Sequence, residues 1–165
     1  MATITYLTKI QFDFGAVQLL AGEMAELGMT RPLLVTDKGV RTVGLLDKVM
    51  EHLPKQCPAE IFDATPENPT EAAMTVALAQ YREAGCDGLI GVGGGSSMDL
   101  AKAIALMATH PGELSEYMSI MGGAPKITVA MAPVIAIPTT AGTGSEVGRG
   151  AIIILDDGRK LGFGS

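Results

Sequence analysis

Tryptophan is absent from this sequence of 165 residues, and aromatic residues of all kinds make up only 4% of it. Cysteine occurs only at Cys57 and Cys86, which is too few for the disulfide framework of a small secreted domain. The amino-terminal segment MATITYLTKIQFDFG has neither the apolar run nor the cleavage site of a signal peptide. No stretch has the roughly 20 apolar residues that span a bilayer. We therefore expect a soluble, cytoplasmic protein without a membrane partner, whose thiols are free and buried.

Positive charge is also scarce. The sequence holds 12 Lys and Arg residues against 18 Asp and Glu residues, a net charge of -6, and its basic residues do not cluster. This balance disfavours nucleic acid and anionic membranes as partners. Apolar residues make up 47% of the chain and charged residues 18%, which is a globular composition sufficient for one ordinary domain.

Strand patterns and helix patterns alternate along the chain. Short apolar runs predict strands over 32–36, 59–64, 87–95 and 132–140, and apolar residues at helical spacing predict helices over 15–27, 40–53, 69–84 and 98–109. The final segment AIIILDDGRKLGFGS predicts a hairpin with Asp157 and Gly158 at its turn, after an irregular stretch over 111–131. This order predicts a single α/β domain, a Rossmann-like doubly wound parallel sheet with a carboxy-terminal β-hairpin.

The segment GLIGVGGGSSMDLAKAIAL, residues 88–106, places Gly93, Gly94 and Gly95 between a predicted strand and a predicted helix. A helix amino terminus has free N–H groups and a partial positive charge, and glycines let a pyrophosphate come close to the backbone. Ser96 and Ser97 would add hydroxyl donors and cap the helix. The segment departs from the dinucleotide fingerprint G-x-G-x-x-G, because position 96 is serine. A tight turn that binds no ligand therefore stays open as the alternative.

Two further segments place polar side chains after predicted strands. Asp37 directly follows the strand LLVT, where ligands gather in a doubly wound sheet. Its carboxylate would accept hydrogen bonds from an adenosine ribose and repel a 2′-phosphate, which favours NAD over NADP. The segment IPTTAGTGSE, residues 137–146, presents Thr139, Thr140 and Thr143 among glycines. A helix-capping or solvated aspartate and a plain threonine-glycine turn remain the alternatives.

Together these segments resemble a known family. VGGGSSMDLAKAIAL is similar to the GGGSxxDxAK segment of the iron-containing (group III) alcohol dehydrogenases, and PTTAGTGSE is similar to their second nucleotide loop. LLVTDKG and ENPT match in order and spacing, so the resemblance covers essentially the whole chain. Within that family, YREAGCDGL, ATHPGELSEY and RGAIIILDDGRKLGF most resemble the 4-hydroxybutyrate dehydrogenases.

The resemblance implies a role in binding NAD for each matching residue. Asp37 would contact the adenosine ribose, and Asn68 would approach the adenine side. The pyrophosphate would bind to Gly94, Gly95, Ser96 and Ser97. Asp99 would brace the glycine turn, which we define as residues 93–95. Thr139, Thr140 and Thr143 would line the nicotinamide-ribose half, and Lys160 would reach a cofactor ribose. Asp99 as a simple first-turn acid and Lys160 as a solvated hairpin lysine are the alternatives.

The resemblance also implies a divalent metal, iron or zinc, held by an aspartate and histidines of a helical domain beyond Ser165. The histidines present, His52 and His110, have no second ligand at metal-binding spacing, so we expect surface or capping roles for them. We expect no metal ligands and no catalytic residue in this chain, which alone would be inactive.

Three functions remain open. The first is the amino-terminal dinucleotide-binding domain, residues 1–165, of a longer two-domain dehydrogenase that oxidises a primary alcohol or hydroxy acid by hydride transfer to NAD. Its partners would be a small-molecule alcohol or aldehyde and further copies of itself, in a homodimer or higher homo-oligomer. The second is a standalone nucleotide-binding module, and the third is an interaction domain without catalytic activity.

Overall fold

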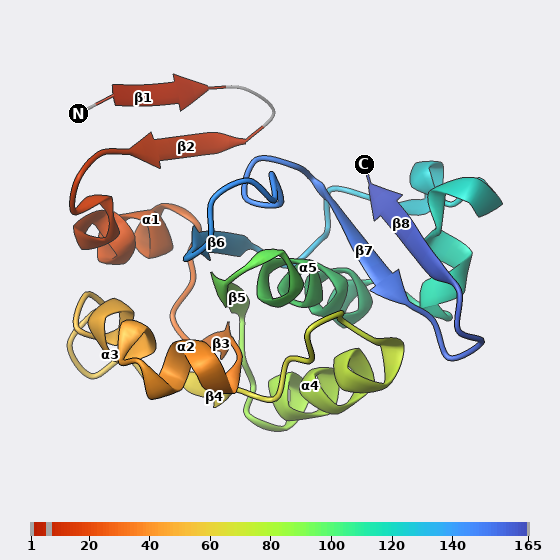
Figure 1. Ribbon diagram of the computed structural model, residues 1–165, viewed down its shortest axis with the longest axis horizontal. Helices are drawn as coiled ribbons and strands as arrows, with labels where there is room; N and C mark the ends of the chain where they lie inside the picture. The colour runs from red at the N-terminus through yellow and green to blue at the C-terminus, as the bar shows by residue number, and fades with distance from the viewer. Residues whose placement is uncertain (1, 6–7, 165) are drawn as a thin grey trace.

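A parallel sheet forms the centre of the computed structural model, which describes residues 2–5 and 8–164 (Figure 1). Its strands are β3 (Pro32–Val35), β4 (Glu60–Phe62), β5 (Gly88–Gly93) and β6 (Val134–Pro138), in the spatial order β4-β3-β5-β6. The central strands β3 and β5 are buried along their whole length, as their unbroken apolar runs predict. The edge strand β6 is only partly buried.

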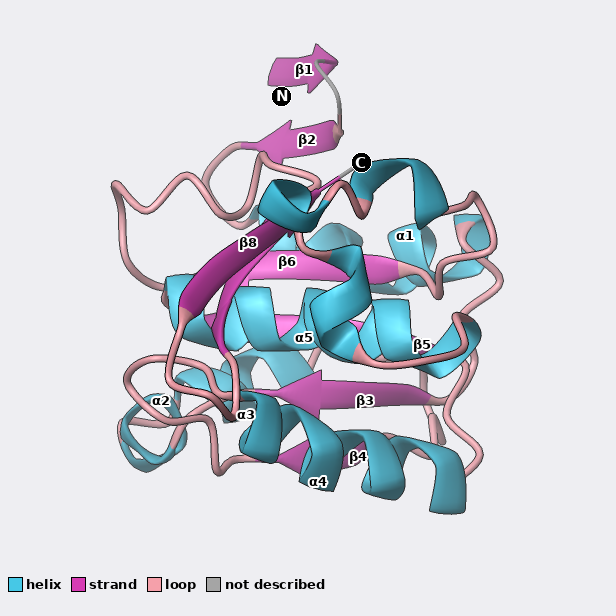
Figure 2. Ribbon diagram, turned by 90° about the vertical axis from the view of Figure 1, so that its right-hand side faces the viewer, coloured by secondary structure: helices cyan, strands magenta, loops and turns pink. Residues whose placement is uncertain are grey.

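Helices cover both faces of this sheet (Figures 1 and 2). One face carries α4 (Glu71–Glu83) and α5 (Gly95–Thr109), and the other carries α1 (Leu20–Glu26), α2 (Lys38–Thr42) and α3 (Leu45–Met50). Successive strand residues point to opposite faces, so Leu33 and Val35 join the core under α4 and α5, whereas Leu34 joins the core under α1 and α3. The predicted doubly wound α/β fold is confirmed.

The order of the strands creates a switch point between β3 and β5. The chain leaves β3 toward β4 on one side of it and then returns to place β5 on the other side. Ligands of doubly wound sheets bind at the carboxyl ends of the strands that flank such a point. Asp37 follows β3 and the glycine turn follows β5, so both segments lie at this point.

Three helix predictions differ from the structure in their bounds or in their helix type. The single helix expected over 40–53 is two short helices, because Gly44 adopts a left-handed conformation (φ 75°) between them, and it ends at Met50. Helix α5 begins at Gly95 instead of Met98, since the backbone of the glycine turn is already helical there. The helix expected over 15–27 begins with a 3-10 turn, η1 (Ala16–Leu19).

Two antiparallel hairpins lie outside the main sheet. The predicted hairpin is confirmed as β7 (Gly150–Ile154) and β8 (Lys160–Gly164), with Gly158 at positive φ (84°) in the turn. A second hairpin, β1 (Ala2–Thr5) with β2 (Lys9–Phe12), was not expected, although the alternation of polar and apolar residues in KIQF is a strand pattern. The irregular segment folds into 3-10 turns, η2 (Leu114–Tyr117), η3 (Ser119–Met121) and η4 (Ala124–Lys126).

Of the two roles expected for His110, surface or capping, the structure shows the capping role. His110 is the C-cap of α5 and is only 7% exposed. Its Nε2 accepts a hydrogen bond from the Thr128 backbone N–H at 2.9 Å. A ring nitrogen that accepts carries no proton, so the proton lies on Nδ1, which donates to the Leu106 carbonyl oxygen at 3.1 Å. His110 therefore ties the end of α5 to the segment before β6.

The cysteines Cys57 and Cys86 are free and only half-buried. Across the described ranges, the helices are all too short or too polar to cross a membrane.

Candidate functional site

The turn from β5 into α5 needs glycine at its first position. Gly93 has φ 149°, a conformation that other residues rarely adopt. A Cβ atom there would lie 2.6 Å from the Ser97 Oγ atom and 3.5 Å from Asp37 Oδ2. The hydroxyl of Ser97 and the carboxylate of Asp37 therefore border the same small space beside Gly93.

The amino terminus of α5 faces this space with its N–H groups unused by the helix. Gly94 is the N-cap and forms no side-chain cap hydrogen bond. The expected capping by Ser96 and Ser97 is therefore wrong. The Ser96 hydroxyl donates instead to the Glu67 carbonyl oxygen, and the Ser97 hydroxyl is buried without a hydrogen-bond partner among the described residues. Free N–H groups, the helix dipole and a donor without an acceptor together suit an anionic oxygen ligand.

Asp37 uses one carboxylate oxygen for structure. As the N-cap of α2 it accepts the Val40 backbone N–H on Oδ1 at 2.9 Å, so the capping interpretation is correct. The other oxygen, Oδ2, is the one that lies toward Gly93. The capping contact thus orients the carboxylate and leaves one oxygen at the carboxyl edge of the sheet.

The threonine loop, which we define as residues 139–149, lies against the glycine turn. The Thr139 N–H donates to the Gly93 carbonyl oxygen at 2.9 Å, which continues the pairing of β5 and β6. Cβ atoms built on Gly94 and Gly95 would lie 3.8 Å from Thr140 Oγ1 and 3.7 Å from Thr143 Oγ1. The structure therefore brings the glycine turn and the exposed threonine hydroxyls to one place.

Asn68 and Lys160, which are 92 positions apart in the sequence, are in direct contact. The Lys160 ammonium donates to Asn68 Oδ1 at 2.8 Å, and both side chains are exposed. Asn68 adjoins Glu67, whose carbonyl oxygen accepts from Ser96. The segment ENPT thus connects the β7–β8 hairpin to the first turn of α5.

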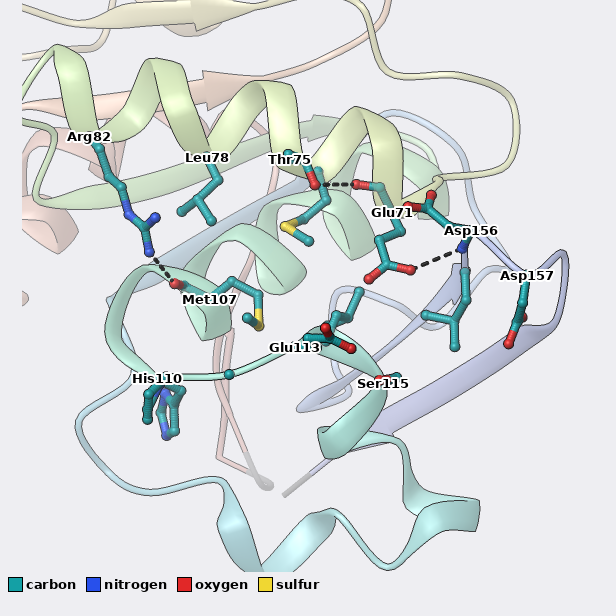
Figure 3. Close-up of a pocket in the computed structure, with 15 residues that line it drawn as sticks. Glu71, Thr75, Leu78, Arg82, Met107, His110, Glu113, Ser115, Asp156 and Asp157 are labelled. Carbon is teal, nitrogen blue, oxygen red and sulfur yellow. Dashed lines mark hydrogen bonds between the residues drawn. The ribbon is translucent and has the colours of Figure 1, made fainter.

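The hairpin is held in this position by contacts with the start of α4. The Ile154 N–H donates to the Pro69 carbonyl oxygen and the Asp156 N–H donates to Glu71 Oε2, each at 2.9 Å. Figure 3 shows the second contact at the edge of a groove of about 550 Å³ that runs along α4 to His110. The groove contains none of the predicted site residues.

Asp99 and Lys102 connect α5 to the threonine loop. Asp99 accepts hydrogen bonds from Ser145 Oγ at 2.5 Å and from the Ile152 N–H at 2.9 Å, so the segments that it braces are the threonine loop and β7. Lys102 is only 6% exposed and donates to Ser145 and Gly150. Sequence reasoning missed Lys102. Its position three residues after Asp99, on the same helix face, was the available signal.

The residues described here do not fit the implied metal. Over 2–5 and 8–164 no group of three His, Cys, Asp or Glu side chains lies close enough together to hold a metal ion. They do fit a dinucleotide, because the N–H groups of α5 and the unpaired Ser97 hydroxyl face the edge where Asp37 and the threonines lie.

The doubly wound parallel sheet, with helices on both faces, places this chain in the Rossmann-like class of α/β folds. The chain belongs to the iron-containing alcohol dehydrogenase family, whose family model matches residues 8–165.

Curated relatives agree with this assignment. The chain is 61% identical to 4-hydroxybutyrate dehydrogenase of Cupriavidus necator over 165 residues, which are 100% of this chain and 43% of that protein. It is 37% identical to 1,3-propanediol dehydrogenase of Klebsiella pneumoniae over 145 residues, which are 86% of this chain and 36% of that protein. The chain thus spans about two fifths of the length of these relatives. The resemblance to 4-hydroxybutyrate dehydrogenases that the sequence predicts is confirmed.

Solved structures share the fold. A 1,3-propanediol oxidoreductase superposes with a TM-score of 0.82 at 36% identity, over 91% of this chain and 39% of that one. A sulfoacetaldehyde reductase from Bifidobacterium kashiwanohense, solved in complex with NAD+, superposes with a TM-score of 0.79 at 25% identity, over 92% of this chain and 39% of that one.

Proposed function

We propose that this chain is the NAD-binding part of a metal-dependent alcohol dehydrogenase. The observation that carries the proposal is the meeting of Asp37, the glycine turn and the threonine loop at the switch point of the sheet. Bound NAD supplies the hydride acceptor for the oxidation of an alcohol to an aldehyde. The residues of this chain bind and orient that cofactor.

Each half of the cofactor has its own residues in this proposal. Asp37 Oδ2 accepts from the adenosine ribose, and Asn68 lies on the adenine side. The pyrophosphate binds the amino terminus of α5 at Gly94, Gly95, Ser96 and Ser97, where free N–H groups favour negative charge. Thr139, Thr140 and Thr143 line the nicotinamide ribose, and Lys160 reaches a cofactor ribose while Asn68 fixes its direction.

We further propose that the whole enzyme oxidises a primary alcohol or a hydroxy acid such as 4-hydroxybutyrate, by analogy with the 61% identical relative. Residues outside this chain would hold a divalent metal, iron or zinc. The groups that move the alcohol proton would also lie outside this chain. We also expect a homodimer or a higher homo-oligomer. The 165-residue chain alone should show no metal-dependent turnover, and measurable turnover would contradict this part of the proposal.

Calorimetric titration with NAD tests the binding proposal. We expect saturable binding that Asp37→Ala weakens by about tenfold or more, since it removes a charge-assisted hydrogen bond worth about 1.5 to 3 kcal/mol. Asp47→Ala is the matched control, because Asp47 is an exposed acid on the neighbouring helix α3 and its loss changes the net charge equally. Equal affinities for the two variants, or no binding by the wild-type chain, would contradict the proposal.

A further inference from the structure

The ammonium group of Lys102 is buried between α5 and the threonine loop. Its three donors are all used, by the Ser145 carbonyl oxygen at 2.5 Å, Ser145 Oγ at 3.0 Å and the Gly150 carbonyl oxygen at 2.9 Å. An ammonium group with three satisfied donors has none left for a ligand. Lys102 therefore has a structural role, in which it joins α5 to Ser145 and Gly150.

Two hydrogen bonds fix the orientation of the Ser145 hydroxyl. Ser145 Oγ accepts from Lys102 and donates to Asp99 Oδ1 at 2.5 Å. The ammonium of Lys102 lies 3.8 Å from the same oxygen of Asp99. Burial lowers the pKa of Lys102, and the carboxylates of Asp99 and Glu146 oppose this effect. A buried network of opposite charges is rigid when each of its polar groups has a hydrogen-bond partner.

Ser145 in turn contacts Thr143. The Ser145 N–H donates to Thr143 Oγ1 at 3.4 Å, which occupies an acceptor site of that hydroxyl and leaves its hydrogen free to donate. Thr143 faces Gly95 at the amino terminus of α5. Asp99, Thr143, Ser145 and Lys160 line a cavity of about 550 Å³, together with the apolar side chains of Ile120, Ile152 and Phe163.

We propose that Lys102 and Asp99 are positioning residues that act through Ser145 to hold the Thr143 hydroxyl as a donor to the nicotinamide half of the cofactor. This inference rests on the proposed NAD binding and changes the role of Asp99 from a brace of the glycine turn to a support of the threonine loop. The adenosine half is held by Asp37, on the other side of the glycine turn, and does not depend on the network.

Binding of NADH and of 5′-AMP to the full chain tests the inference, because 5′-AMP occupies only the adenosine half. Ser145→Ala removes the hydroxyl that joins Lys102 and Asp99, while the Lys102 bonds to the two carbonyl oxygens remain. We expect NADH to bind about fivefold to tenfold more weakly, the effect of one lost hydrogen bond, and 5′-AMP to bind as before. Ser145→Thr should restore the NADH affinity, and the control Ser115→Ala, on η2, should leave both affinities unchanged.

An unchanged NADH affinity in Ser145→Ala, or an equal loss for both ligands, would overturn the inference while leaving the proposed function intact. A wild-type chain that binds neither ligand would overturn the proposed function itself. Lys102→Met should weaken NADH binding in the same selective way. Should that variant not fold, Ser145→Ala and Asp99→Asn decide the question.

Discussion

Asp37 caps a helix and also borders the candidate site. Its Oδ1 atom caps α2 and its Oδ2 atom lies at the carboxyl edge of the sheet beside Gly93. Any variant that removes the carboxylate also removes the helix cap, which is worth about 1 kcal/mol. A substitution that removes the charge of Asp37 but keeps the helix cap is therefore needed to measure the effect of the charge alone.

Asp37→Asn achieves this separation, because asparagine keeps a capping oxygen and loses the charge. At an effective dielectric of about 20, a carboxylate about 4 Å from a 2′-phosphate raises the free energy of binding NADP by about 4 kcal/mol. Removing about a third of this repulsion changes a dissociation constant by about tenfold. We expect the ratio of the NADP and NAD dissociation constants to fall by at least about tenfold, measured by calorimetry. A ratio equal to that of the wild-type chain would mean that Asp37 does not face the ribose.

Cys86 illustrates the effect of burial on a single group. Burial and the neighbouring Glu60 carboxylate raise the pKa of its thiol to about 11. At pH 8 the thiolate fraction is then about two orders of magnitude below that of an ordinary thiol with a pKa of about 8.5. In a Cys57→Ser background we expect iodoacetamide to alkylate Cys86 correspondingly slowly, with a rate that rises with pH up to about 11. The same variant unfolded in urea is the control, and equal rates in the folded and unfolded chains would refute the raised pKa.

At the scale of elements, the candidate site lies where the carboxyl ends of β3 and β5 meet the start of α5. Contacts between the other elements hold the surrounding loops in place. The β7–β8 hairpin reaches the site through its contacts with Pro69 and Glu71, and the end of α5 is fixed by His110. Such contacts join residues that are far apart in the sequence, so they determine where the loops lie.

His110→Ala tests the contribution of one such contact. The substitution removes the hydrogen bonds to Leu106 and Thr128 from a buried position. We expect the free energy of unfolding, measured by urea denaturation, to fall by about 1 to 3 kcal/mol. His52→Ala is the control, since His52 is only partly buried in a turn after α3, and should cost less than about 0.5 kcal/mol. Similar losses for both variants would contradict the assigned role of His110.

At the scale of the whole molecule, the sequence predicts those features that depend on local pattern. The apolar runs of β3 and β5 and the helical spacing of α4 are enough to predict a doubly wound sheet. The break at Gly44 was missed, because an isolated glycine within a helical pattern does not reveal its φ angle. The β1–β2 hairpin was missed although its alternation is visible.

The candidate site was predictable only in its parts. Apolar runs place Asp37, the glycine turn and the threonines at strand ends, and the family resemblance adds Asn68, Asp99 and Lys160. The contacts between Lys160 and Asn68 and between Lys102 and Ser145 span 92 and 43 positions, and local spacing carries no information about such pairs. The sequence shows only that Lys102 lies three residues after Asp99, and its burial is a property of the fold.

A crystal structure of the chain with NAD bound would test the proposed binding mode most directly. We expect the pyrophosphate to lie against the N–H groups of Gly95, Ser96 and Ser97, the adenosine ribose within hydrogen-bonding distance of Asp37 Oδ2, and the nicotinamide half beside Thr143. A dinucleotide bound away from the glycine turn, or in the reverse orientation with its adenosine at the threonine loop, would contradict it.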